Sequence, residues 1–269
     1  MTQEKDSFIT PETGRWVLFA AILASSMAFI DGSALNVALP ALQRDFDASG
    51  ADLLWVLNSY ALFLAALLLV GGALGDRFGR KRVFMIGIAI FAVASLACGF
   101  APSVQALIAA RAVQGVGGAL MVPGSLSLIS ALFPPDRRGT AIGTWSSFST
   151  ITTLLGPALG GLLAAQGLWR AVFFINVPLA LLALAALHFK VPESINPNAP
   201  RQLDYWGAAL VTLGLAALTF GLLQVPEAGW GAPLTLAALG GGVAALVGFV
   251  AVEARSPQPM VPLGLFKNR

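Results

Sequence analysis

The chain has 269 residues, of which 57 % are hydrophobic and 11 % are charged, and its mean hydropathy is +0.80. This composition excludes an ordinary soluble domain and predicts a membrane protein. With a formal net charge of only +3, we do not expect the protein to bind nucleic acid. The single cysteine, Cys98, excludes a disulfide framework and a cysteine-based metal site.

Apolar stretches of membrane length recur along the chain. A bilayer core of about 30 Å needs roughly 20 apolar residues of helix, and Gly, Pro and charge clusters separate eight such stretches. The first is too long for a removable signal peptide, so we expect it in the mature protein. The predicted spans cover about 16–39, 53–74, 83–100, 104–126, 141–165, 171–187, 206–223 and 234–252.

The positions of the basic residues predict which way these spans face. With a cytoplasmic N-terminus, thirteen of the sixteen Lys and Arg fall inside, whereas only Arg44 and Arg170 fall outside. An even number of spans returns the C-terminus to the same side. We therefore expect a multi-pass protein of a bacterial cytoplasmic (inner) membrane with both termini in the cytoplasm.

These spans give an all-α polytopic membrane protein. The break after the sixth span is polar and carries three prolines, so it is interpreted as a linker between bundles. The expected segments are a cytoplasmic N-terminal segment at 1–15, a six-helix transmembrane bundle at 16–189, a cytoplasmic linker at 190–205, an extra transmembrane helix pair at 206–252 and a cytoplasmic segment at 253–269.

Two charged residues lie inside predicted spans, Asp31 in the first and Arg111 in the fourth. A charge at the bilayer centre costs about 2.5–3.5 kcal/mol on insertion scales, so both are candidates for function. Each lies roughly 10 Å below the outer end of its span, at about 1.5 Å per residue, so we expect both to face one water-filled cavity. Asp31 would bind and release a proton or a cationic substrate, with Arg111 tuning its access to water. The alternative is an ion pair that only orients two helices.

Further polar residues mark the end of the first span, which is predicted near Pro40. Ser33 and Asn36 are expected to hydrogen-bond across helices, as polar residues in membranes tend to do. Helix packing is their alternative role.

The predicted turn between the second and third spans is short, glycine-rich and basic. Its glycines allow a tight turn and close helix approach. On composition alone it is a basic loop that sets the orientation of the chain. The residues singled out there are Gly72, Asp76, Arg77, Gly79, Arg80, Lys81 and Arg82.

The spacing in this turn resembles the signature of the major facilitator superfamily, Gly-x-Leu-(small)-Asp-Arg-x-Gly-Arg followed by two basic residues. Residues 30–40 are similar to the helix 1 motif of the fourteen-helix drug:proton antiporter branch, with Ser33 where Thr is usual. Residues 107–119 are similar to its helix 4 motif, whose arginine, implicated in proton transfer, falls on Arg111. The remaining helix 4 motif positions are Gln114, Gly115 and Gly118.

A glycine- and proline-containing segment of the fifth span resembles the antiporter motif of exporters, and its residues are Gly156, Pro157, Gly160 and Gly161. The first glycine of that motif is Thr152 here, whose β-branched side chain is expected to hold two helices slightly apart. Pro157 is expected to kink or open the helix, and Gly156 with Gly160 to form a small-residue packing face.

The resemblance covers essentially the whole chain and implies a major facilitator N-terminal six-helix bundle plus two additional transmembrane helices, about eight of fourteen. We expect a fragment whose C-terminal half is missing in cis, or else a homodimer. A truncated chain that transports nothing alone is a further alternative.

The function expected from this resemblance is proton-coupled multidrug efflux by a secondary active transporter. Its partners would be protons, the lipid bilayer and a lipophilic small molecule, with cations favoured by Asp31. The alternative is a carrier that exports a metabolite such as an amino acid, sugar or siderophore. No enzyme activity, metal or cofactor is expected, because no ligand cluster, nucleophile elbow or phosphate-binding loop is recognisable.

Overall fold

The computed structural model describes residues 10–195 and 204–255, and this part of the chain is helical and contains no strand. Its eight membrane-length apolar helical segments confirm the eight predicted spans, one of which consists of α6 and α7 together. The helices are α1 (Pro11–Phe46), α2 (Gly50–Phe78), α3 (Arg80–Gly99), α4 (Val104–Leu132), α5 (Pro135–Ala165), α6 (Ala171–Phe174), α7 (Asn176–Lys190), α8 (Tyr205–Ala228) and α9 (Pro233–Glu253).

Most helices extend beyond the predicted spans because capping residues, rather than hydrophobicity, end them. The Thr10 hydroxyl accepts a hydrogen bond from the Thr13 amide before α1, and Asp47 ends α1 in the left-handed conformation at φ 50°. Ser49 and Asp52 form a reciprocal capping box at the start of α2. The 36 residues of α1 reach about 54 Å at 1.5 Å each, well beyond the bilayer core.

One sequence prediction about a helix end was wrong, and a proline is involved. α1 was expected to end near Pro40 but continues through it to Phe46; proline removes one backbone donor, and the surrounding helix tolerates that loss. The sixth predicted span, 171–187, is confirmed as one membrane-length helical segment, Ala171–Lys190, in which the single residue Ile175 separates α6 from α7. Ile175 keeps helical backbone angles, φ −58° and ψ −32°, while Pro178 lacks the backbone N–H that would bond to the carbonyl oxygen four residues earlier.

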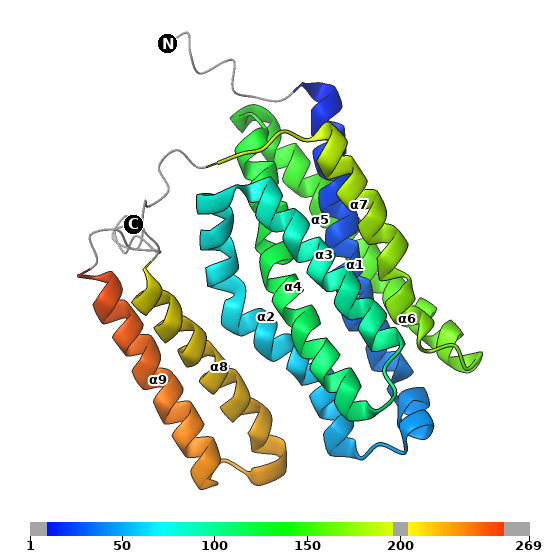
Figure 1. The fold of residues 1–269 in the computed structure, drawn as a ribbon, viewed down its shortest axis with the longest axis vertical. Coiled ribbons are helices and arrows are strands. Elements are labelled where there is room, and N and C mark those ends of the chain that lie inside the picture. The colour runs from blue at the N-terminus through cyan, green and yellow to red at the C-terminus, as the bar shows by residue number, and fades with distance from the viewer. Residues whose placement is uncertain (1–9, 196–203, 256–269) are drawn as a thin grey trace.

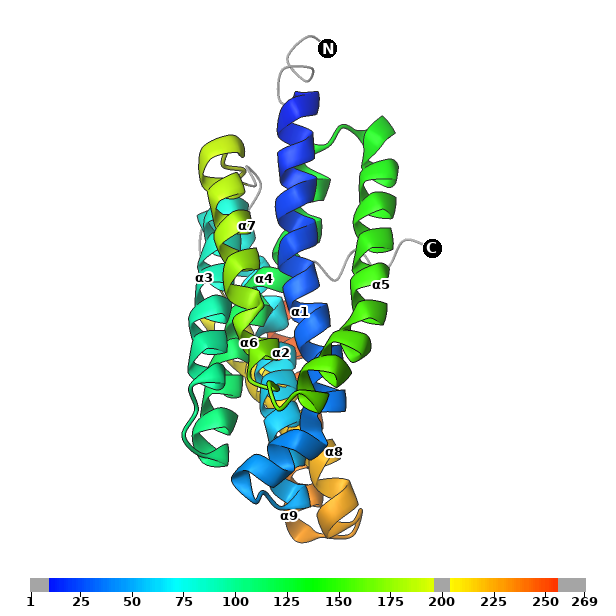
Figure 2. The same ribbon diagram turned by 90° about the vertical axis from the view of Figure 1, so that its right-hand side faces the viewer.

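The first seven helices form one bundle, and α8 and α9 lie side by side at its edge (Figure 1). α8 runs next to α2, where the rings of Trp55 and Phe220 lie 5.9 Å apart. The turns α2–α3 and α4–α5 and the end of α7 lie at the end of the bundle where α1 begins (Figure 2). We call this the basic end, since it gathers Arg80, Lys81 and Arg137.

The bundle buries its apolar side chains along α1, α3 and α4, where Met27, Phe84, Phe91 and Met121 are fully buried. Its outer surface is apolar as well, and Val93, Leu154 and Leu213 are each more than half exposed. Apolar residues on both the inside and the outside of a helix bundle fit a lipid environment. The chain is therefore a multi-pass membrane protein.

The described ranges limit three of the segment predictions. Residues 196–203 of the predicted linker, residues 1–9 of the predicted N-terminal segment and residues 256–269 of the predicted C-terminal segment lie outside the described part. Within the linker, residues 191–195 follow α7 and return to the start of α3.

Candidate functional site

The two charged residues inside the spans meet in the bundle. The guanidinium of Arg111 on α4 donates through Nη1 to Oδ2 of Asp31 on α1, and the two form an ion pair. The Arg111 Nε donates to the Val56 carbonyl oxygen of α2 at 3.1 Å. The ring of Tyr60 lies under the guanidinium, 4.5 Å from its carbon to the ring centroid, so an aromatic face balances part of the positive charge.

Side-chain amides complete the environment of Asp31. Gln114, one turn after Arg111, donates through Nε2 to Asp31 Oδ1 at 2.9 Å and accepts from Arg111 Nη1 at 2.7 Å. Asn176 at the start of α7 donates to the same Asp31 oxygen at 3.3 Å. Ser95 on α3 accepts from both amides, at 2.8 and 3.1 Å. We call Asp31, Arg111, Gln114, Ser95 and Asn176 the buried polar cluster.

Burial distinguishes this cluster from a water-lined site. The side chains of Asp31 and Arg111 are 0 % and 1 % exposed, and Gln114, Ser95 and Asn176 are each 0 % exposed. The expectation that the pair faces a water-filled cavity is not met in this conformation. Such burial is tolerable because the two charges neutralise each other and both Asp31 oxygens accept hydrogen bonds.

The helix 1 motif residues lie beside this cluster but do not join it. The Ser33 hydroxyl donates to the Phe29 carbonyl oxygen at 2.6 Å, and the Asn36 amide donates to the Gly32 carbonyl oxygen at 2.6 Å. The predicted bonds across helices were therefore wrong: both side chains reach back to their own helix, a local alternative that short polar side chains commonly adopt.

Helix 4 motif glycines bring α4 close to α2. A Cβ atom on Gly115 would lie 2.5 Å from the Tyr60 carbonyl oxygen, and one on Gly118 would lie 3.2 Å from the Tyr60 hydroxyl. Any side chain at Gly115 would push the two helices apart. This contact holds the Tyr60 ring under Arg111, so the glycines contribute to the site through packing.

The basic α2–α3 turn forms a second polar group at the basic end. Arg80 pairs with Asp76, with Nη2 2.8 Å from Oδ1, and the side chains are 18 % and 40 % exposed. Gly79 joins the two helices at φ 106°, a conformation that favours glycine. The side chain of Lys81 donates to the Val191 carbonyl oxygen at 2.6 Å. The turn is thus tied to the segment that follows α7.

Glu193, which was not singled out from the sequence, holds the start of α3. Its two carboxylate oxygens accept from the backbone amides of Lys81 and Arg82, at 2.9 and 3.1 Å. Ser194 accepts from the Arg80 amide at 2.9 Å. The first amides of a helix have no partner within it and favour an anion, so Glu193 acts as a remote cap. No local motif marks this role, because its partner is more than a hundred residues away.

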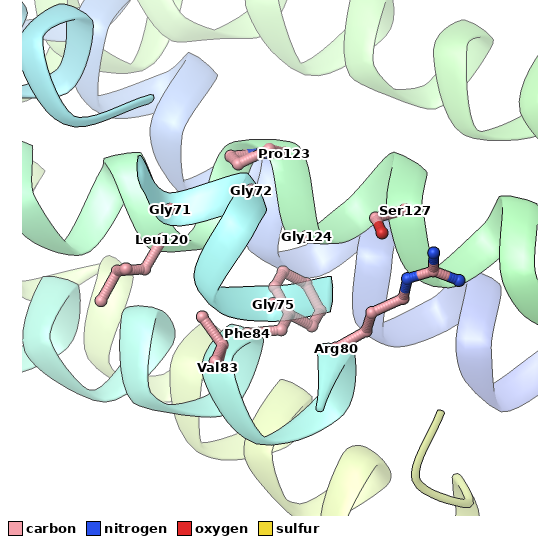
Figure 3. A pocket seen from close by; sticks show the side chains of 10 residues that line it. All are labelled: Gly71, Gly72, Gly75, Arg80, Val83, Phe84, Leu120, Pro123, Gly124 and Ser127. Carbon is pink, nitrogen blue, oxygen red and sulfur yellow. The ribbon is translucent and has the colours of Figure 1, made fainter. Parts of the chain in front are cut away.

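A small hollow lies among α2, α3 and α4 near this turn. Figure 3 shows Gly71, Gly72 and Gly75 of α2 beside Leu120 and Pro123 of α4. Phe84 closes it from α3, and Arg80 stands at its edge (Figure 3). Gly72, expected to allow close approach, has nothing within 4 Å of a Cβ position, so its own place in the hollow is open.

The predicted antiporter motif forms the contact between α5 and α1. A Cβ atom on Gly156 would overlap Ser33, and one on Gly160 would overlap the backbone of Ala34, so the expected small-residue packing face is confirmed. Gly161 is less tightly placed, 3.5 Å from Val37. The hydroxyl of Thr152 turns back onto α5, where it donates to the Ser149 carbonyl oxygen at 2.9 Å.

Sequence reasoning missed three other residues beside the ion pair. Ser95, Tyr60 and Asn176 come from α3, α2 and α7, and each is at most 9 % exposed. A polar residue within a predicted apolar span was the available signal for Ser95 and Asn176. Tyr60 carried no such signal, because tyrosine is also common in helix packing.

A family model described as Major Facilitator Superfamily matches residues 21–266. The tetracenomycin C resistance and export protein of Streptomyces glaucescens is 41 % identical over 93 % of this chain and 47 % of its own length. The multidrug resistance protein Stp of Mycobacterium tuberculosis is 38 % identical, with the same coverages. The methylenomycin A resistance protein of Bacillus subtilis is 36 % identical over 96 % of this chain and 55 % of its own length. The chain thus spans about half the length of these relatives.

Solved structures agree on the fold. The peptide transporter POT in complex with sulfate superposes with a TM-score of 0.65 at 17 % identity, covering 92 % of this chain and 53 % of that one. An inward-facing bacterial homologue of the human lysosomal transporter Spinster gives a TM-score of 0.59 at 24 % identity, covering 96 % and 68 %. At these identities the likeness concerns the fold alone.

Proposed function

The chain belongs to the Major Facilitator Superfamily, and from that premise we propose that it serves proton-coupled export of a small lipophilic compound across the cytoplasmic membrane. The proposed activity is transport without catalysis, with both termini in the cytoplasm. Its relatives named for antibiotic resistance and export support this direction and substrate class.

One observation carries the proposal: an aspartate and an arginine are paired and fully buried between α1 and α4. A buried pair is costly to maintain and weak evidence of stability, so its presence inside two apolar helices favours a functional role. Asp31 is the proposed proton site. Lipophilic cations are the proposed substrates in a state in which the Asp31 carboxylate has separated from Arg111, because only then does it offer an uncompensated negative charge.

Proton uptake would change the balance of this cluster. With Asp31 ionised the pair is neutral, whereas a proton on Asp31 leaves the Arg111 charge without a counter-charge in a buried site. An unpaired buried charge is strongly unfavourable, so the protonated state would favour a rearrangement of α1 against α4 that lets water or another group reach Arg111. This rearrangement would be one step of alternating access, in which the two helical bundles of a transporter rock against each other.

Efflux from lipid vesicles tests the proposal. The protein would be reconstituted into lipid vesicles, which would be loaded with a fluorescent lipophilic cation and given a pH gradient. We expect Asp31→Asn to abolish proton-driven efflux, because asparagine has the same shape but cannot ionise. Asp47→Asn, at the exposed end of α1, is the matched control and should retain efflux.

The outcomes separate the parts of the proposal. Efflux that persists unchanged in Asp31→Asn would remove this residue from proton coupling. If the unsubstituted protein moves no lipophilic cation at all, export of a metabolite becomes the better proposal, and amino acids and sugars would be assayed in the same vesicles.

A further inference from the structure

We infer that Asn176 is a positioning residue for the proton on Asp31, and that its side-chain amide turns over when Asp31 becomes protonated. In the deprotonated state the amide nitrogen donates to Asp31; in the protonated state the amide oxygen accepts the new O–H. This inference deepens the proposed function and rests on proton uptake at Asp31.

The hydrogen bonds around Asp31 describe its deprotonated form. Oδ2 accepts from Arg111, while Oδ1 accepts from Gln114 at 2.9 Å and from Asn176 at 3.3 Å. A carboxylate that only accepts is satisfied by this set. A proton on Oδ1 would point at two N–H donors, so the acid form needs one neighbour to change from donor to acceptor.

The two neighbouring amides differ in their freedom to make that change. The Gln114 oxygen already accepts from Arg111 at 2.7 Å and from the Cys98 thiol at 3.7 Å. The Asn176 oxygen is buried and has no hydrogen-bond partner among the described residues. Turning Gln114 would break bonds to its oxygen, whereas turning Asn176 brings an unused acceptor to Asp31. The rotation is about a terminal torsion with a broad, two-fold energy profile.

Ser95 keeps a hydrogen-bond partner when Asn176 turns. Its Oγ accepts from Asn176 at 3.1 Å and from Gln114 at 2.8 Å. When Asn176 turns, Ser95 keeps the bond from Gln114, and a hydroxyl can rotate to donate or to accept. The proton itself comes from water and ends on Asp31 Oδ1, and no other covalent bond forms or breaks.

Among the described residues, no other titratable group beside the cluster competes for this proton in the neutral range. The groups facing Asp31 are Arg111 on α4, Tyr60 on α2 and Cys98 on α3. A guanidinium stays charged, and phenols and thiols ordinarily titrate above neutrality, at about 10 and 8.5. The described part of α7 contributes the amide of Asn176 and no charged group at this depth.

Infrared difference spectroscopy of the chain as it stands can follow this proton without any transport. In membranes, the carbonyl band of protonated Asp31 is identified by its absence in Asp31→Asn. We expect Asn176→Leu to lower the pH at which this band is half-formed by about one unit, because the acid form loses its acceptor. The lost donor bond matters less, since it is long and the carboxylate keeps Arg111 and Gln114.

Two further variants serve as controls. Asn176→Thr retains one oxygen that both donates and accepts, so the transition should return to within about 0.3 unit of the unsubstituted chain. Asn58→Leu makes the same exchange on α2, at a half-buried position outside the cluster, and should leave the transition unchanged.

The unsubstituted chain with isotope-labelled asparagine gives a second measurement that does not depend on whether Asn176→Leu folds. The Asn176 carbonyl band should move to lower frequency as Asp31 is protonated, because it gains a hydrogen bond. An unmoved band, or a transition in Asn176→Leu that stays or rises, would overturn the role of Asn176. If no band disappears in Asp31→Asn, proton uptake at Asp31 fails instead, and with it the proposed function.

Discussion

Two Asp–Arg pairs occupy different environments in this molecule. Asp31 and Arg111 come from α1 and α4 and are 0 % and 1 % exposed, whereas Asp76 and Arg80 flank the α2–α3 turn at 40 % and 18 %. The chemistry of the two pairs is the same. Because the first pair is buried, losing one of its partners should lower the free energy of unfolding by a large amount. The same loss in the second pair should lower it only slightly.

The surroundings differ in the same sense. The buried pair is enclosed by a fixed set of donors and acceptors from several helices, including Gln114 and Asn176. The Asp76–Arg80 pair is partly exposed and lies beside the start of α3, which Glu193 caps through the Lys81 amide. A charge in the bundle therefore depends on side chains of other helices, while a charge at the turn depends on local geometry and on water.

The largest effect is expected when the buried pair loses its cation. Arg111→Gln leaves the Asp31 carboxylate buried without a counter-charge and should lower the free energy of unfolding by about 3–5 kcal/mol. Titration with a denaturing detergent in mixed micelles measures this loss. The defect should shrink as the pH falls, because a proton neutralises the carboxylate.

The double variant Asp31→Asn with Arg111→Gln provides the control for this prediction. It should recover much of the lost stability, since neither charge is left alone. Equal instability of the double and single variants would show that the pair is not energetically coupled.

A second contrast compares one glycine near each pair. Gly115→Ala should lower the free energy of unfolding by about 1–3 kcal/mol, because its Cβ atom would lie 2.5 Å from the Tyr60 carbonyl oxygen. Gly72→Ala has open space and should leave stability unchanged or raise it by about 0.5–1 kcal/mol through helix propensity. Similar effects at both positions would contradict the difference in packing. The same detergent titration measures both.

A smaller, local effect is expected at the cap of α3. Glu193→Ala should destabilise the first turn of α3 by about 1 kcal/mol, so the amides of Lys81 and Arg82 should exchange hydrogen about five times faster. Hydrogen exchange resolved to single residues measures this, with an amide in the middle of α3 as the internal reference. Unchanged exchange at both amides would argue against the capping role.

The smallest effect is expected at the partly exposed Asp76–Arg80 pair. Arg80→Gln removes an ion pair between residues four apart and should cost about 0.3–0.5 kcal/mol. The same detergent titration measures it beside Arg111→Gln. A loss as large as that of the buried pair would mean that exposure does not decide the energetics of these charges.

Much of the fold could be predicted because a bilayer imposes length and hydrophobicity on every helix. The eight spans and the family signature in the α2–α3 turn could both be recognised in the sequence. Helix ends were less predictable, because capping residues such as Thr10 and Asp47 set the ends of α1. The helix also continues through Pro40, where the sequence suggested an end.

The site residues that carry a charge inside an apolar span could be predicted from the sequence. The uncharged site residues could not. Asp31 and Arg111 stood out because a charge in an apolar span requires an explanation. The partners Ser95 and Asn176 were not identified, because their hydrogen bonds depend on which faces of α3 and α7 turn toward α1.

The sequence by itself determined that the chain is a multi-pass helical membrane protein with two charges in its spans and a basic turn between its second and third helices. Only the tertiary structure decided that the two charges are paired away from water, that Asn176 has an unused acceptor beside them and that Glu193 caps α3. The physical reason is that hydrophobicity and helix length are properties of single segments, whereas burial and hydrogen-bond partners arise only when segments distant in the chain pack together.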